Sequence, residues 1–80
     1  MEIAYTNHAE EKIAERKIPK TIIEDALKNP NAVADGTLGR KIAHKLIRDK
    51  LLRIVYEQAG REYIIITAYY TEPGRYGMIL

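Results

Sequence analysis

Hydrophobic and polar positions change their period along the chain, from a helical repeat in the first third to alternation in the second half. Residues 40–48 alternate, which predicts a strand. Residues 51–57 predict the next strand. Residues 62–70 give the strongest strand signal, because they hold a continuous apolar run typical of central strands covered on both faces. The short turns between these segments predict successive hairpins, and therefore an antiparallel meander.

The first third predicts a short strand followed by a helix. Residues 3–5 can form the strand, and Asn7 with Glu10 has the spacing of a capping box at a helix start. The first helix is expected to run to about Lys17. Its apolar stripe is thin, so we expect it to pack lightly.

A second helix is expected to begin near Pro19, with apolar residues at helical spacing. It ends before Pro30, since proline disfavours helical geometry in the preceding residue. Residues 32–34 predict a short extended piece, and residues 75–80 a tail or short edge strand. The pattern predicts one α+β domain over residues 1–80. It has a short N-terminal strand and two helices packed on a three- to four-stranded antiparallel meander.

Composition narrows the class of protein. Eighty residues correspond to one small domain. The absence of cysteine excludes disulfides and thiolate metal sites. No apolar run approaches the ~18 residues of a membrane span, and the N-terminus lacks a signal-peptide pattern. We therefore expect a cytoplasmic protein with no membrane association.

Charge is unevenly distributed, although the net charge is only +2. Residues 1–35 carry seven acidic and five basic side chains, whereas residues 36–80 carry eight basic and four acidic ones. Such asymmetry indicates an anionic partner for the second half, or else an ordinary solvated strand face. The candidate RNA-binding residues are Arg40, Lys41, His44, Lys45 and Arg48.

The chemical groups available are bases, histidines and tyrosines. The chain has no phosphate-binding glycine loop, no HExxH motif and no serine, and its carboxylates form no metal-ligand pattern. We therefore expect no metal and no cofactor. A metal-independent ribonuclease needs one group to take the proton of the ribose 2′-hydroxyl, and another to protonate the leaving 5′-oxygen. It also needs cations to stabilise the charge of the phosphorane.

Arg53 is the most informative single cation. Its neighbours in the predicted strand are apolar, and alternation places it on the same side as Leu51 and Val55. A charge in such surroundings needs an acidic partner, such as Glu24 or Glu57, or else a ligand.

The chain also resembles a widespread bacterial and archaeal domain family of unknown function. Members read as His, a short helix, Arg-Gly-Ile, an amphipathic helix, Asn-Pro, and then strands. His8, residues 16–18 and residues 29–30 match this order, except that Lys17 stands in place of the usual Gly. Pro19 replaces the usual capping Ser or Thr. The family is similar in layout to RelE/ParE toxins and related compact ribonucleases.

This resemblance implies a toxin-type endoribonuclease that cleaves by 2′-hydroxyl attack and leaves a cyclic phosphate. The implied cleft contains His8, Arg16, Arg53, Thr67 and Tyr69. His8, Arg16, Arg53 and Tyr69 are the candidate catalytic residues, and His8 or His44 is the proton shuttle. The implied partners are RNA, free or on the ribosome, and an antitoxin protein, with monomer and homodimer both open. The alternatives are a non-catalytic module that binds RNA or a protein, and a degenerate toxin relative kept for dimerisation.

Overall fold

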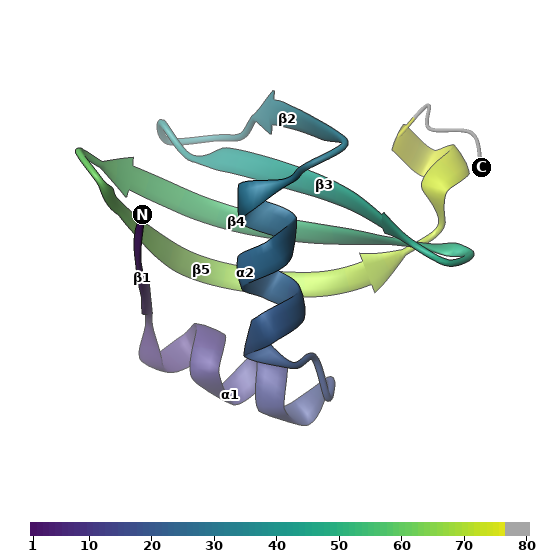
Figure 1. Cartoon of the computed structure of the whole chain (residues 1–80), viewed down its shortest axis with the longest axis horizontal. Coiled ribbons are helices and arrows are strands. Elements are labelled where there is room, and N and C mark those ends of the chain that lie inside the picture. Colours follow the sequence, from purple (N-terminus) through teal and green to yellow (C-terminus); the bar gives the residue numbers. More distant parts are fainter. Residues whose placement is uncertain (77–80) are drawn as a thin grey trace.

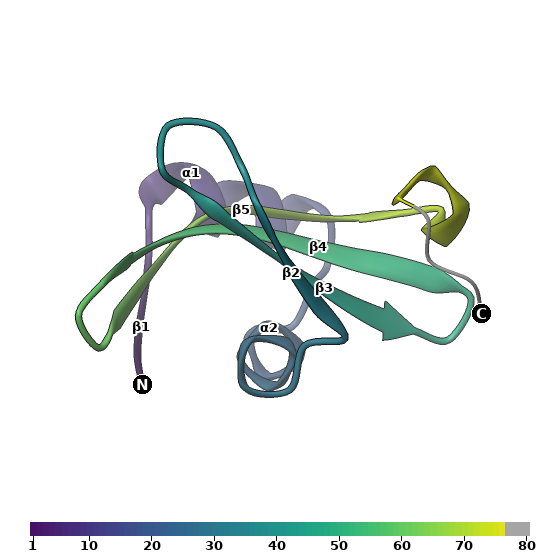
Figure 2. The same cartoon turned by 90° about the horizontal axis from the view of Figure 1, so that it is seen from above.

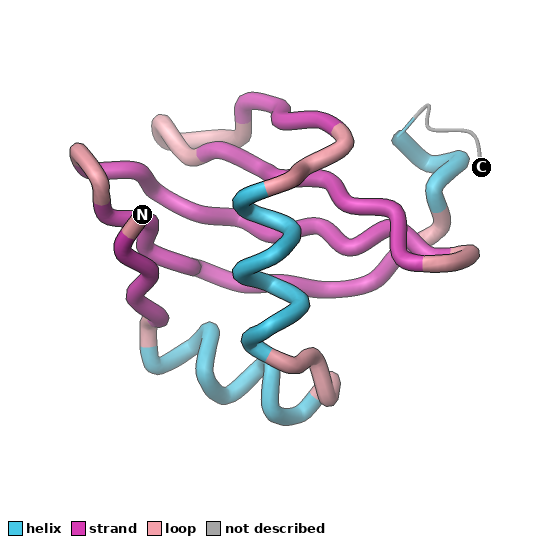
Figure 3. Tube along the Cα trace, in the orientation of Figure 1, coloured by secondary structure: helices cyan, strands magenta, loops and turns pink. Residues whose placement is uncertain are grey.

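The computed structural model describes residues 1–76 and contains two helices and five strands (Figure 1). Figure 3 shows how the helices, strands and loops follow one another along the chain. The elements are β1 (Glu2–Tyr5), α1 (Asn7–Glu15), α2 (Lys20–Lys28), β2 (Ala32–Asp35), β3 (Lys41–Ile47), β4 (Lys50–Ala59), β5 (Glu62–Thr71) and a 3₁₀ helix, η1 (Pro73–Tyr76). The first two residues of the expected C-terminal tail belong to η1, and the rest of that tail lies outside the described residues.

The sheet has the order β1-β5-β4-β3-β2, so the α+β prediction is confirmed with a larger sheet than expected. β2 pairs antiparallel with β3, and β1 pairs parallel with β5, with Tyr5 opposite Ile65. The sheet is therefore mixed. Segments of four residues carry no measurable period by themselves, and their strand character comes from the hydrogen bonds of a longer neighbour.

The beginning of α1 differs from the expected capping box. Thr6 is the N-cap, and its Oγ1 accepts a hydrogen bond from the backbone N–H of Ala9 at 3.0 Å. Asn7 is the first helical residue. Both residue types cap helices well, and the structure uses the one whose extended backbone continues β1.

The way α1 ends explains why the resembling family usually has Gly where this chain has Lys17. The backbone N–H of Ile18 donates to the carbonyl of Ile13, and that of Lys17 donates to the carbonyl of Ala14. These two bonds form a Schellman motif, in which the residue at position 17 is left-handed. Lys17 has a φ of +56°, a conformation that glycine adopts without steric cost.

The two faces of the sheet differ in what covers them. Figure 2 shows α2 on one side of the sheet and η1 on the other, while α1 runs alongside β5. We call the side packed against the helices the helix face and the opposite side the open face. One apolar core joins the helices to the helix face, and it contains Ala9, Ile13, Ile18, Ile23, Ala26, Leu27, Ala43, Leu52, Ile54, Tyr56, Ile65 and Ala68.

A β-bulge in β5 decides which residues reach the open face. Val55 pairs with Thr67 and Tyr56 pairs with Ile65, so Ile66 is an extra residue in β5. The alternation of β5 shifts by one position at this bulge. As a result Ile65 and Ala68 both face the helices, and Tyr69 lies on the open face beside Arg53.

Neither α1 nor α2 is long and apolar enough to cross a membrane, and this holds for every helix among residues 1–76.

Candidate functional site

Three strands place His44, Arg53 and Tyr69 side by side on the open face. His44 of β3 pairs with Arg53 of β4, and Arg53 pairs with Tyr69 of β5. Side chains directly opposite one another on neighbouring strands have Cβ atoms about 5 Å apart, close enough to bond. Tyr76 of η1 lies over this row. We call these four residues the open-face cluster.

Arg53 is the centre of the cluster. Its Nε–H donates to Nε2 of His44 at 3.0 Å, and its Nη1 donates to the hydroxyl of Tyr69. The ring of Tyr76 stacks on the guanidinium, with 3.9 Å between Cζ and the ring centroid. As expected, Arg53 shares its face with Leu51 and Val55, and it is half-buried.

No carboxylate pairs with Arg53 among residues 1–76. Glu57, one of the expected partners, pairs with Arg40 at 3.2 Å. Glu24, the other, accepts a hydrogen bond from the hydroxyl of Tyr5 at 3.1 Å. The guanidinium is thus held by an imidazole and two phenols. Within the described chain, its positive charge has no ion-pair partner.

The contact with Arg53 determines the state of His44. Because Nε2 accepts a hydrogen bond, it carries no proton, and the neutral ring has its proton on Nδ1. The side chain is buried, with only 6% of His44 exposed. Burial, and then the charge of Arg53, lower the pKa of His44 below its ordinary value. His44 is therefore an uncharged base at neutral pH, with its Nε2 lone pair already engaged.

The pKa of Tyr69 is shifted in the opposite direction to that of His44. Burial raises the pKa of its phenol, and hydrogen bonding with Tyr76 adds to this, while the charge of Arg53 acts in the other direction. The hydroxyl of Tyr69 keeps its proton at neutral pH and can donate it. The cluster therefore combines a base, an acid and a cation within hydrogen-bond reach of one another.

Arg16 reaches the same region from the end of α1. Its Nη1 donates to the carbonyl of Ala68 at 2.9 Å and to Oγ1 of Thr67 at 3.2 Å. β1 ends opposite Ile65, so beyond that residue β5 is an edge strand of the described sheet. Its outward carbonyls there have no partner strand, and Arg16 bonds one of them. The guanidinium lies 6.0 Å from the ring of Tyr69, which brings a second arginine to the rim of the cluster.

His8 lies apart from the cluster. It is exposed in the first turn of α1, eight residues before Arg16, a helical rise of about 12 Å. Tyr70 follows Tyr69 but points to the helix face, where it is opposite Leu52. Of the candidate catalytic set, the structure thus brings together Arg16, Arg53 and Tyr69, joined by His44.

The expected RNA-binding residues are divided between the two faces. Lys41 and Lys45 lie on the helix face: Lys41 pairs with Asp35, and Nζ of Lys45 donates to the carbonyl of Asn29 at 2.7 Å. Arg48 lies exposed in the β3–β4 turn. Arg40 pairs with Glu57, as described above, which leaves His44 as the member of this set that joins the cluster.

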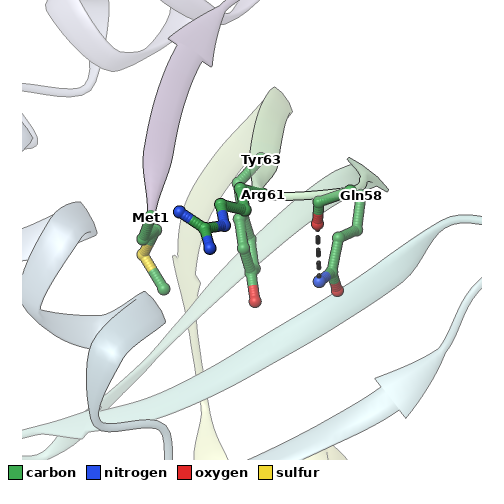
Figure 4. A pocket seen from close by; sticks show the side chains of 5 residues that line it. Met1, Gln58, Arg61 and Tyr63 are labelled. Carbon is green, nitrogen blue, oxygen red and sulfur yellow. Dashed lines mark hydrogen bonds between the residues drawn. The ribbon is translucent and has the colours of Figure 1, made fainter.

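A hollow of about 300 Å³ lies at the opposite end of β4, lined by Met1, Gln58, Gly60, Arg61 and Tyr63 (Figure 4). Gln58 bends back there to donate to the carbonyl of Gly60 at 3.4 Å. Five residues of strand, or about 16 Å, separate Gln58 from the centre of the open-face cluster. The hollow contains no imidazole or carboxylate, so its lining offers no acid–base pair.

Within residues 1–76, no three His, Asp or Glu side chains gather closely enough to hold a metal ion. The residues that do gather are arginine, histidine and tyrosine.

Comparison with known proteins places the chain in a family. Residues 5–70 match the family described as a domain of unknown function, DUF4258, and the chain belongs to that family. The matched segment includes Arg16, His44, Arg53 and Tyr69 and ends before Tyr76. No curated protein and no solved structure matches the chain.

Proposed function

We propose that the open-face cluster binds the phosphodiester backbone of RNA and cleaves it without a metal ion. The observation that carries this proposal is Arg53, a half-buried guanidinium with no carboxylate partner among residues 1–76 and with a base and an acid as its neighbours. A charge in such a position is costly unless a ligand compensates it. The resemblance of the sequence to a family with a layout like that of RelE-like toxin ribonucleases favours the same reaction class.

The proposed reaction assigns one step to each group. His44 takes the proton of the ribose 2′-hydroxyl at Nε2, and the 2′-oxygen attacks the phosphorus. The bond from phosphorus to the 5′-oxygen breaks, and Tyr69 gives its hydroxyl proton to that oxygen. The products are a 2′,3′-cyclic phosphate and a free 5′-hydroxyl. Arg53 and Arg16 hold the extra negative charge of the phosphorane. Each acid–base group contributes about 10²–10⁴ in rate.

A non-catalytic RNA-binding module is the second candidate, and one observation favours it. Nε2 of His44 is engaged by Arg53, and Tyr76 lies over the pair, so the base is not free in this state. A domain that only binds RNA needs the cation and the aromatic rings and has no need of a free imidazole.

Cleavage of end-labelled RNA in excess EDTA, with and without ribosomes, separates the two candidates. We expect products that end in a 2′,3′-cyclic phosphate. His44→Gln should lower the rate by at least about 10², the contribution of one acid–base group. His8→Gln is the matched control, because His8 is the other histidine of the chain and lies outside the cluster.

RNA binding without cyclic phosphate products under either condition would establish the binding module instead. Cleavage that requires a divalent ion, or that falls equally in His8→Gln and His44→Gln, would refute the proposed reaction.

A further inference from the structure

The hydrogen-bond donors of Arg53 are unequally used. A guanidinium has five N–H donors on Nε, Nη1 and Nη2. Nε donates to His44 and Nη1 donates to Tyr69, whereas Nη2 has no hydrogen-bond partner among residues 1–76. Of the five donors, three therefore have no partner among residues 1–76: one on Nη1 and two on Nη2. One of the two on Nη2 lies next to the Nε–H already given to His44, on the side of the guanidinium formed by Nε and Nη2.

Oxyanions bind arginine most strongly through two parallel N–H···O bonds. On the side of Arg53 that faces His44, such a pair needs both Nε–H and Nη2–H. Only one of the two is free, because Nε–H is bonded to Nε2 of His44. A bidentate oxyanion at this position must therefore replace the imidazole as the acceptor of Nε–H.

We infer that a tetrahedral oxyanion bound to Arg53 takes Nε–H away from His44 and so releases the Nε2 lone pair of His44. In terms of the proposed function, on which this inference rests, the phosphate of the substrate activates the base that acts on it. Before the ligand arrives, Arg53 holds the ring in one tautomer and blocks Nε2. Arg53 is thus a positioning residue for His44 as well as a ligand of the phosphate.

Few other groups of the described residues face His44 closely enough to change its pKa. From β4 it faces Arg53, and from η1 it faces the ring of Tyr76, with 5.6 Å between ring centroids. From β2 the residue in register is Ala32, which has no titratable side chain. Within residues 1–76, Arg53 is the charged group that faces the imidazole. We therefore expect the transfer of its Nε–H bond from His44 to an oxyanion to have the largest effect on the pKa of His44.

The oxyanion should make His44 more basic for two reasons. It compensates the charge of Arg53, which lowers the pKa of His44 in the free state, and it places an acceptor beside the ring. Sulfate is a suitable probe, because it is tetrahedral and keeps its double charge through the titration range of histidine. Chloride at matched ionic strength accounts for general screening.

The test is an NMR titration of the two histidine rings of the wild-type protein against pH, in sulfate and in chloride. In chloride, His44 should titrate below the ordinary value of a histidine, with the ¹⁵N shifts of an Nδ1-protonated neutral ring. In saturating sulfate, the midpoint of His44 should rise by about one pH unit or more, the usual effect of an adjacent opposite charge. His8, exposed and distant, is the internal control. In Arg53→Gln, the midpoint of His44 should already be raised in chloride and should respond little to sulfate.

A midpoint of His44 that is the same in sulfate and chloride would overturn the inference, including the case where sulfate shifts only the Arg53 resonances through Nη1 and Nη2. If sulfate raises the titration midpoint of His44 as expected but the protein never cleaves RNA, the inference is upheld and the ribonuclease proposal is refuted. If the protein cleaves RNA but sulfate leaves the midpoint of His44 unchanged, the ribonuclease proposal is upheld and the inference is refuted.

Discussion

Replacing Arg53 by methionine tests whether this cation serves a ligand or the fold. Methionine keeps much of the apolar stem and removes the guanidinium. The variant loses two hydrogen bonds to neutral partners and one stacking contact, and it no longer has to desolvate a half-buried charge. The groups left behind, His44 and Tyr69, are uncharged. We therefore expect a net loss of about 1 kcal/mol in the free energy of unfolding.

That loss corresponds to a fall in Tm of about 4–8 °C for a domain of this size. A buried arginine paired with a carboxylate would instead cost about 3–5 kcal/mol on removal of one partner, and a fall in Tm more than twice as large. Affinity for single-stranded RNA should drop markedly in the same variant. The slope of log K against log salt should become shallower by about 0.7, the share of one phosphate contact.

Arg40→Met is the matched control, since Arg40 is already paired with Glu57. It should change the salt slope much less than Arg53→Met does. Thermal melting and RNA binding at several salt concentrations measure both quantities. A large fall in Tm for Arg53→Met, together with unchanged RNA binding, would show that the cation serves the fold and would refute our reasoning.

Three further predictions follow from other parts of the structure. Lys17→Gly should raise the free energy of unfolding by about 0.5–1 kcal/mol in denaturant titration, because glycine removes the strain of the left-handed backbone; an unchanged or lower value would contradict the Schellman assignment. Reversing Lys41 and Lys45 to Glu should weaken RNA binding less than loss of the cluster arginine does, since both lysines lie on the helix face; an equal or larger effect would place the RNA on that face. Burial, then a neighbouring carboxylate, raise the pKa of Tyr5 above its ordinary value of 10.0. The folded state therefore holds this proton more tightly than the unfolded state, and the stability it contributes is present below about pH 10 and lost as pH rises further. Tyr5→Phe should flatten the fall in Tm above pH 10, and a curve parallel to that of the wild type would refute this.

The pairing of His44 with Arg53 follows from the sequence once the hairpin turn is placed. A two-residue turn at Arg48-Asp49 puts Ile47 opposite Lys50, and counting back gives His44 opposite Arg53. The two strands were readable from the sequence, but the sequence indicates the tight turn one residue later, at Asp49-Lys50, which would place His44 opposite Val55; the register of this half of the cluster therefore came from the structure.

The pairing of Arg53 with Tyr69 was not predictable either, for a different reason. It depends on the bulge at Ile66, which shifts the alternation of β5 inside an apolar run. All residues of that run are compatible with either face, so no local pattern shows where the extra residue lies. The approach of Arg16 to the free edge of β5 likewise depends on β1 ending at Tyr5, a contact between segments far apart in the chain.

The pairing of β1 with β5 also has a consequence for how the chain acquires its structure. The first strand finds its partner only about sixty residues later, with Glu2 opposite Glu62 and Tyr5 opposite Ile65. α1 packs mainly against that same last strand. During synthesis, the β3–β4 hairpin can form early from neighbouring residues, but β1 and α1 must wait until β5 has left the ribosome. Closing so long a loop is a slow step, so we expect folding to be limited by docking of the N-terminal segment rather than by hairpin formation.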